Sequence, residues 1–154
     1  MKLSSAAFES GQAIPVRFTC DGQNLSPALS WSGAPQQTAA FALMVDDPHA
    51  PGGTFTHWVL FNLPARLRQL PQGVSQAEAQ VDGGTQGQND FGTIGYGGPC
   101  PPAGHPHHYR FTLYALDRTL DLRARATKQQ VRKAVQGHVL DQALLVGIYQ
   151  RKPS

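Results

Sequence analysis

The residue types that could do chemistry in this sequence gather in its middle third. Five of its six histidines lie between His49 and His108, and Asp47 stands just before the first of them. Imidazole N–H groups and loop amides bind phosphate-type oxygens, and a carboxylate beside them can fix a histidine tautomer or accept a proton-bearing ligand oxygen. If the segments that carry them are neighbours, Asp47, His57 and His107 predict a site that captures a small anion.

A segment rich in glycine and proline separates these histidines. Between Gly83 and Gly104 lie eight of the sixteen glycines, three prolines and a single charged residue, Asp90. This composition argues against a regular element, and a loop of this length in a compact domain is usually functional or disordered. The aromatic residues Phe91 and Tyr96, together with the stiff prolines that follow, favour an ordered loop.

Strands must position these groups. Continuous apolar runs predict strands that are buried on both faces, and shorter alternating segments followed by turn residues predict half-buried strands. Strands separated by turn clusters are typical of a mostly antiparallel β-sandwich. The predicted strands are 16–19, 29–31, 39–45, 57–63, 109–116 and 143–149.

One helix is predicted near the C-terminus. Thr127 can cap it, apolar residues repeat at helical spacing from Val131 to Val135, and Gly137 ends it. The predicted fold is therefore mostly β with a small C-terminal α element.

Length and composition favour a single globular domain and argue against a transmembrane helix. The chain has 154 residues, of which 40% are hydrophobic and only 15% charged, so we expect one globular domain over residues 1–154. Its longest apolar run, 39–45, has the length of a strand and not of a transmembrane helix. The N-terminus shows no basic-then-apolar signal segment, which predicts a cytoplasmic location.

The charge distribution does not indicate a nucleic-acid partner. The net charge is +3, with −3 through residue 109 and +6 from Arg110 onward. The basic residues are mostly spaced singly between apolar ones, as on the solvated faces of strands and a helix.

No cofactor or metal is predicted. Cys20 and Cys100 match no CxxC pattern and cannot form a four-ligand zinc site alone. They could meet in space, but a cytoplasmic chain favours free thiols. The sequence also lacks HExxH, GxSxG and a Walker loop. Two alternatives to an anion site stay open: a hydrolase that uses the same Asp/His groups, with or without a metal, and purely structural roles for these residues.

Several spaced motifs occur in order along nearly the whole chain. They are Phe18-Thr19-Cys20-Asp21-Gly22, Asp47-Pro48-His49-Ala50-Pro51, His57-Trp58-Val59, Asn89-Asp90-Phe91-Gly92, Gly98-Pro99-Cys100-Pro101-Pro102 and His107-His108-Tyr109. This series resembles the phosphatidylethanolamine-binding protein family, and most of all its bacterial Raf kinase inhibitor-like branch of the YbhB/YbcL type.

The resemblance implies a Greek-key-type β-sandwich with an anion pocket at one end. Asp47, His57 and His107 match the polar residues of that pocket, where the two histidines would donate to the anion. The family's geometry also implies a cis peptide bond between Ala50 and Pro51. The residues that match the pocket walls are Pro51, Trp58, Gly98, Pro99, Pro101, Pro102 and Tyr109.

The resemblance further implies a non-enzymatic protein that binds a small anion or a phosphorylated small molecule. Members of the family act as binding and regulatory proteins, including inhibitors of kinases and proteases, and bacterial members resemble homodimers. This chain departs from the family pattern at the pocket rim, where His49 replaces the usual Asp and His108 replaces the usual Arg.

Overall fold

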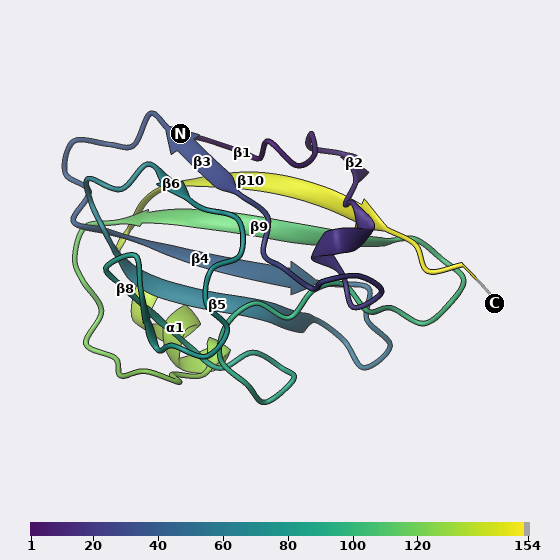
Figure 1. Ribbon diagram of the computed structural model, residues 1–154. Coiled ribbons are helices and arrows are strands. Elements are labelled where there is room, and N and C mark those ends of the chain that lie inside the picture. The colour runs from purple at the N-terminus through teal and green to yellow at the C-terminus, as the bar shows by residue number, and fades with distance from the viewer. Residues whose placement is uncertain (153–154) are drawn as a thin grey trace.

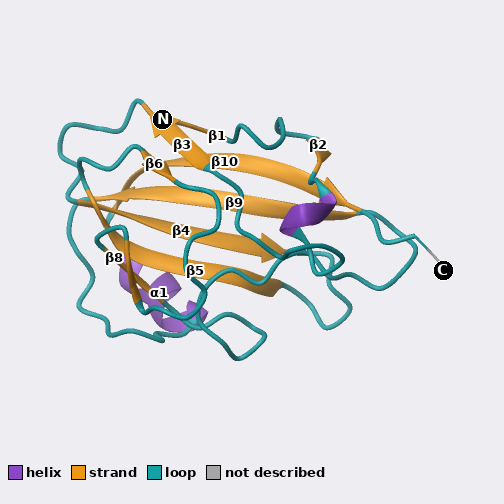
Figure 2. Ribbon diagram, viewed as in Figure 1, coloured by secondary structure: helices purple, strands orange, loops and turns teal. Residues whose placement is uncertain are grey.

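A seven-stranded sheet forms the middle layer of the computed structural model, which describes residues 1–152 (Figure 1). A three-stranded sheet packs on one face of it, and helix α1 (Lys128–Val135) packs on the other (Figure 2). The smaller sheet has the order β1 (Lys2–Ser4), β3 (Leu29–Ser32), β6 (Gln69–Leu70). The larger has the order β2 (Gln12–Ala13), β10 (Val139–Tyr149), β9 (His107–Leu116), β4 (Ala40–Asp47), β5 (Phe55–Pro64), β8 (Gly84–Gln86), β7 (Gln80–Val81).

The pairing confirms a mostly antiparallel β-sandwich. Every paired strand is antiparallel to its neighbour within residues 1–152, except that β2 runs parallel to β10. Five of the six predicted strands are present, with shifted ends, as β3, β4, β5, β9 and β10.

The strand predicted at 16–19 is wrong, because this segment forms a 3₁₀ helix over Val16–Phe18. Local hydrogen bonds close the turn: the Phe18 N–H donates to the Pro15 carbonyl at 3.0 Å, and the Thr19 hydroxyl donates to the Val16 carbonyl at 2.8 Å. Alternation over four residues is too short a signal to outweigh a proline followed by such bonds.

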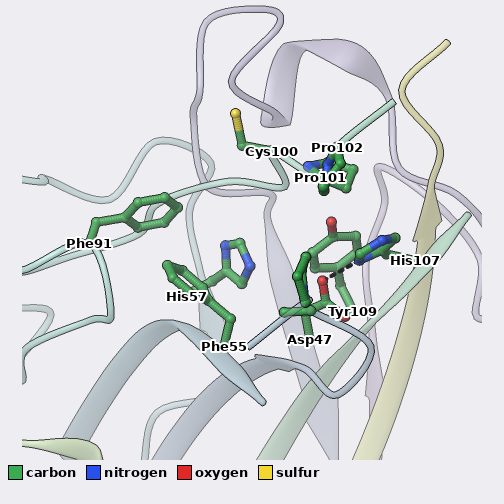
Figure 3. A pocket seen from close by; sticks show the side chains of 11 residues that line it. Asp47, Phe55, His57, Phe91, Cys100, Pro101, Pro102, His107 and Tyr109 are labelled. Atoms are coloured by element: carbon green, nitrogen blue, oxygen red, sulfur yellow. Dashed lines mark hydrogen bonds and ion pairs between the residues drawn. The ribbon is translucent and has the colours of Figure 1, made fainter. Parts of the chain in front are cut away.

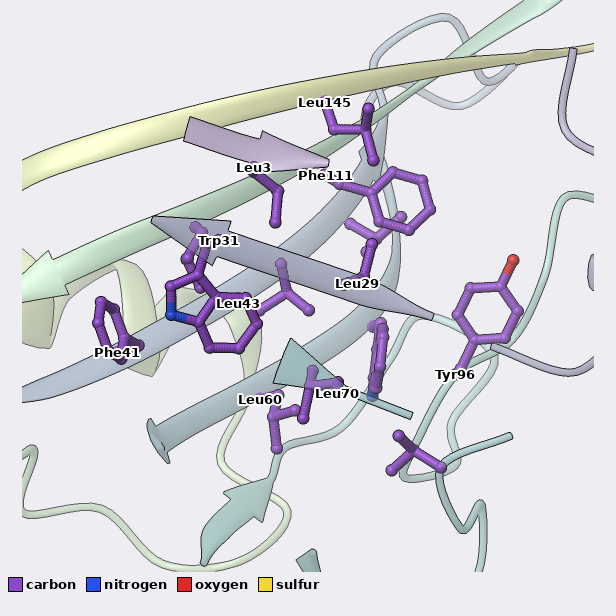
Figure 4. Packing of buried hydrophobic residues seen from close by; sticks show 14 of the residues in the cluster. Leu3, Leu29, Trp31, Phe41, Leu43, Leu60, Leu70, Tyr96, Phe111 and Leu145 are labelled. Carbon is purple, nitrogen blue, oxygen red and sulfur yellow. The ribbon is translucent and has the colours of Figure 1, made fainter. Parts of the chain in front are cut away.

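Two hydrophobic clusters explain the continuous apolar runs in β4 and β5. On β4, Phe41 and Leu43 face the smaller sheet, whereas Ala42 and Met44 face α1. Figure 4 shows the first cluster, where side chains of the two sheets interdigitate. A strand between two apolar layers needs no polar face, so its sequence does not alternate.

Helix α1 confirms the predicted cap. The Thr127 hydroxyl accepts from the Gln130 N–H at 3.2 Å, and the Gln130 side chain accepts from the Thr127 N–H at 2.9 Å. Gly137, with φ of 80°, follows the helix end as expected.

The glycine-rich segment is an ordered loop over most of its length, but the prediction that it contains no regular element is wrong at its start. Strand β8 pairs with β5 there, with Thr85 opposite Phe61. A Cβ at Gly84 would collide with the Leu63 side chain and the Phe61 carbonyl, so glycine permits the close approach of the two strands.

Cys20 and Cys100 form a disulfide, so the expectation of free thiols is wrong. Their Cα atoms lie 5.4 Å apart although 80 positions separate them in sequence. The free thiols were expected from the predicted compartment alone, whereas the disulfide depends on the fold, which brings these two cysteines together. Within residues 1–152, no helix has the length and apolar character needed to cross a membrane.

Candidate functional site

Antiparallel pairing brings the predicted site residues to one edge of the large sheet. Asp47 is the last residue of β4, which lies between β5 and β9. Both neighbours run in the opposite direction, so the C-terminal end of β4 meets their N-terminal ends, which carry His57 and His107. The register therefore places all three predicted polar residues around one site.

A cavity of about 210 Å³ opens at this edge (Figure 3). Its walls are mainly apolar, and its polar groups come from β4, β5 and β9. The lining residues are Asp47, Ala50, Pro51, Phe55, His57, Phe91, Cys100, Pro101, Pro102, His107 and Tyr109. A concave, mainly apolar site with few polar groups is typical of small-molecule binding.

The Asp47 carboxylate is held on both oxygens. Its Oδ2 lies 2.6 Å from His107 Nδ1, and its Oδ1 accepts the backbone N–H of His49 at 2.9 Å. Both side chains are buried, with Asp47 3% and His107 8% exposed. A carboxylate that accepts two hydrogen bonds is stabilised in its ionised form, so His107 Nδ1 is the donor and its Nε2 is left for the cavity.

His57 is fixed by the loop that follows β8. Its Nδ1 lies 2.7 Å from the Gly97 carbonyl, which can only accept, so Nδ1 carries the hydrogen. The Gly97 N–H returns a bond to the His57 carbonyl at 3.0 Å. Burial lowers the pKa of His57, and the Gly97 carbonyl and the Asp47 carboxylate partly oppose this effect.

Tyr109 supplies a hydroxyl that has no partner. The side chain is 1% exposed, and its hydroxyl makes no hydrogen bond within the described residues although it borders the cavity. Figure 3 shows the hydroxyl directed toward Pro101 and Pro102, next to His107. Burial raises the pKa of Tyr109, with the Asp47 charge adding to the effect, so the group is a protonated donor at neutral pH.

Polar side chains fix the shape of the loop of residues 87–104, called the pocket loop below, and tie it to Asn24. The Asn89 Oδ1 accepts the N–H groups of Phe91 and Thr93 at 3.0 and 3.1 Å, and its Nδ2 donates to the Gly95 carbonyl at 2.9 Å. The Gly98 N–H donates to Asn24 Oδ1 at 2.8 Å. A Cβ at Gly98 would collide with the Phe18 carbonyl and with Asn24, so only glycine fits there.

Seven of the ten predicted site residues line the cavity, and three do not. Trp58 follows His57 on β5 and therefore points to the opposite side, where its indole N–H donates to Gln86 Oε1 at 2.8 Å. Gly98 and Pro99 lie behind the wall: Gly98 borders a neighbouring depression, and the Pro99 carbonyl accepts the Cys20 N–H at 3.1 Å. All three position the wall rather than form its surface.

Four residues of the wall were not predicted: Ala50, Phe55, Phe91 and Cys100. Phe55 stands two positions before His57 on one strand, a spacing that places both on the same side and could have revealed it. Phe91 is 47% exposed, and its ring centroid lies 4.8 Å from that of Phe55 and 5.4 Å from that of His57. The contact of Phe91 with these two rings depends on the path of the loop, and the sequence contains no periodic pattern that predicts this path.

The predicted cis peptide bond at Ala50–Pro51 is wrong, because residues 1–152 contain no cis peptide bond. The Gly53 N–H donates to the Ala50 carbonyl at 3.0 Å and closes a β-turn. Pro51 occupies the second position of this turn, where a trans proline fits; a cis proline would occupy the third.

The replaced rim residues form a second group of histidines outside the cavity. The ring centroids of His49 and His108 lie 5.6 Å apart, and both border a depression that also contacts His105 and His107. In the part of the chain that the structure describes, no three His, Cys, Asp or Glu side chains are arranged to hold a metal ion.

Comparison with known proteins gives one consistent result. The model of the family described as "Phosphatidylethanolamine-binding protein" matches residues 4–150. A UPF0098 protein of Methanothermobacter thermautotrophicus is 50% identical over 151 residues, which cover 98% of this chain and 99% of the relative. LppC of Mycobacterium tuberculosis, which carries the name of a lipoprotein, is 42% identical over 152 residues, covering 97% of this chain and 72% of the relative.

A solved structure agrees with these matches. The crystal structure of Escherichia coli YbcL, described as a new member of the mammalian PEBP family, aligns with a TM-score of 0.92. It shares 33% sequence identity, and the alignment covers 98% of each chain.

Proposed function

The chain belongs to the phosphatidylethanolamine-binding protein family, and on this premise we propose that it is a non-enzymatic binding protein that holds a small phosphate-like anion in the cavity beside Asp47. Family membership supports a binding protein in general. The particular ligand class follows from the groups that this chain presents: the Tyr109 hydroxyl and the free Nε2 atoms of His57 and His107.

The unpartnered Tyr109 hydroxyl carries the proposal. A buried donor without a partner costs about 1–3 kcal/mol, so a fold that keeps one at a cavity wall favours a ligand that accepts from it. An oxyanion small enough for a cavity of about 210 Å³ accepts in several directions at once. Mainly apolar walls surround these groups and lower the local dielectric constant, which strengthens each hydrogen bond.

The test is a titration with inorganic phosphate and with phosphoethanolamine, followed by backbone amide shifts in NMR. We expect saturable shifts at Gly97, Gly98 and residues 46–51. His57→Ala should abolish them without unfolding the domain, whereas the matched variant His138→Ala should keep them, since His138 lies beside Asp117 and outside the cavity. Unchanged affinity in His57→Ala would remove the site assignment. The two probes separate a need for phosphate alone from a need for the amine of a headgroup.

The Asp47–His107 hydrogen bond also fits a hydrolase, the second candidate function. A carboxylate that orients Nδ1 leaves Nε2 as a general base for a water molecule in the cavity. Turnover of phosphoester or ester substrates, lost in Asp47→Ala, would favour this function. Saturable phosphate binding without turnover would favour the binding protein.

Three further expectations stay predictions: a homodimer, regulation of a partner kinase or protease, and a cytoplasmic location. A sedimentation mass of twice 16.6 kDa would confirm the dimer, and a pull-down competed by phosphate would indicate a partner at the cavity. The Cys20–Cys100 disulfide stands against the cytoplasm, since disulfides are typical of oxidising compartments. Thiol trapping in fractionated cells tests the location.

A further inference from the structure

The cavity offers fewer hydrogen-bond donors than an anion needs. The Nδ1 hydrogens of His57 and His107 are both used by protein acceptors, the Gly97 carbonyl and the Asp47 carboxylate. A neutral imidazole carries one N–H, so each Nε2 atom that remains is a lone pair. With both rings neutral, the Tyr109 hydroxyl is the one side-chain donor among the residues that line the cavity.

The charge of the cavity also opposes an anion. Asp47 is ionised, and the lining residues include no lysine or arginine. An incoming oxyanion would therefore face a carboxylate and two lone pairs in a site of low dielectric constant, where each repulsion is large. A proton on one Nε2 removes both problems, because it turns an acceptor into a donor and adds a positive charge.

His57 is the ring that takes this proton. The Nδ1 hydrogen of His107 is already engaged by the Asp47 carboxylate, at 2.6 Å. His57 bonds to a neutral carbonyl and is 4% exposed, and burial lowers its pKa, so it is neutral in the empty site at neutral pH. Asp46 and Asp47 oppose the effect of burial only in part, and a bound anion adds the further negative charge that stabilises the imidazolium form of His57.

We propose that the site binds its oxyanion together with one proton, which passes from solvent to Nε2 of His57 on binding and returns to solvent on release. The inference rests on the proposed function and specifies it: the bound species is an ion pair between the anion and the His57 imidazolium. The proton leaves a buffer acid or hydronium ion in solution and forms the Nε2–H bond of His57, and no other covalent bond is made or broken. Affinity falls as the pH rises, because each binding event consumes a proton.

Other charged groups near His57 are already paired or lie outside the cavity. Asp46 pairs with Arg132 of α1 at 3.1 Å, and Asp90 of the pocket loop pairs with Lys128 of α1. The groups that face His57 or its cavity are Asp46 and Asp47 on β4, His107 and Tyr109 on β9, and Asp90 in the pocket loop, which bonds to the neighbouring Thr56 N–H. His49 and His108 border a separate depression.

The experiment is isothermal titration calorimetry with inorganic phosphate at pH 8.0 in HEPES and in Tris, which differ in their enthalpy of ionisation. The difference in observed binding enthalpy gives the number of protons taken up. We expect an uptake of about one proton and an affinity that falls up to about tenfold from pH 7.5 to 8.5. Measurable binding with no uptake would overturn the inference and leave the proposed function intact; no binding at all would overturn both.

Three variants test whether His57 is the histidine that takes up the proton. His57→Gln places an amide N–H near the position of Nε2 without a titrating group, so we expect phosphate binding with no proton uptake. Tyr109→Phe should weaken binding about tenfold, the effect of one lost hydrogen bond, and keep the uptake. His108→Gln, at the rim, should keep both. Full proton uptake in His57→Gln would contradict the assignment to His57.

A direct measurement covers the case in which His57→Gln does not fold. In wild-type protein labelled with ¹⁵N at histidine, the Nε2 signal of His57 should move from the lone-pair range to the N–H range as phosphate is added at pH 8.0. A signal that stays in the lone-pair range at saturation would overturn the inference.

Discussion

Helix α1 and the pocket loop both lie against β5, and different interactions hold them there. Helix α1 contacts the sheet through the apolar side chains of Val131 and Val135. The pocket loop is held by hydrogen bonds from Asn89, Asn24 and the backbone of β5, by the Cys20–Cys100 disulfide and by the ion pair of Asp90 with Lys128 of α1. Apolar packing tolerates small displacements, whereas directed hydrogen bonds fix the position of each carbonyl.

The difference fits what each segment must do. The Gly97 carbonyl decides which nitrogen of His57 carries its hydrogen, so a shift of a few tenths of an ångström in the loop would alter the site. Helix α1 has no contact with the cavity and only needs to cover one face of β4 and β5. Changes to the loop should therefore cost both stability and phosphate affinity, and changes to the buried apolar face of the helix only stability.

The largest effect is expected from the disulfide. In the double variant Cys20→Ser/Cys100→Ser, the unfolded chain regains the freedom of a loop closed over 80 positions, which corresponds to about 4 kcal/mol of unfolding free energy. Phosphate affinity should fall as well, because Cys100 forms part of the cavity wall. Urea denaturation and calorimetry measure the two effects. A loss below about 1 kcal/mol would show that the loop does not depend on this link.

The next effect is expected at Asn89, which is 2% exposed. Asn89→Ala leaves the N–H groups of Phe91 and Thr93 and the Gly95 carbonyl without their partner, at a cost of about 3 kcal/mol in unfolding free energy. We expect weaker phosphate binding at the same time, since the loop carries Gly97. Stability lost without any change in affinity would show that the loop keeps its shape without Asn89.

A smaller effect, confined to stability, is expected at Val131 of α1, which is 1% exposed. Val131→Ala removes two buried carbon atoms and should cost about 2 kcal/mol in urea denaturation. Phosphate affinity measured by calorimetry should equal that of wild type. A coupled loss of affinity would contradict the separation between helix and cavity.

The smallest effect is expected at the helix cap. Thr127→Ala removes one side of the capping box and should lower the unfolding free energy by about 1 kcal/mol. Thr127→Ser keeps the hydroxyl and serves as the control, with stability close to wild type. Equal losses in both variants would show that the methyl group of Thr127 matters and the cap does not.

Local sequence patterns were sufficient for the elements that depend on local physics. The apolar runs of β4 and β5, the alternation of β9 and the cap at Thr127 are all visible without a structure, because burial and capping leave a periodic or positional signal. The approach of Asp47 to His57 was also predictable, since a short turn joins the antiparallel strands β4 and β5. The place of His107 beside them was expected from the resemblance to the family.

Tertiary structure alone decided how those groups are used. Residues far apart in sequence fix the loop that selects the His57 tautomer, join Cys20 to Cys100 and turn Trp58 away from the cavity. Among residues 1–152, no other segment brings a hydrogen-bond partner to the Tyr109 hydroxyl. Sequence patterns report which side chains are buried, whereas the partners of a buried polar atom depend on contacts between distant segments, which leave no periodic trace in the sequence.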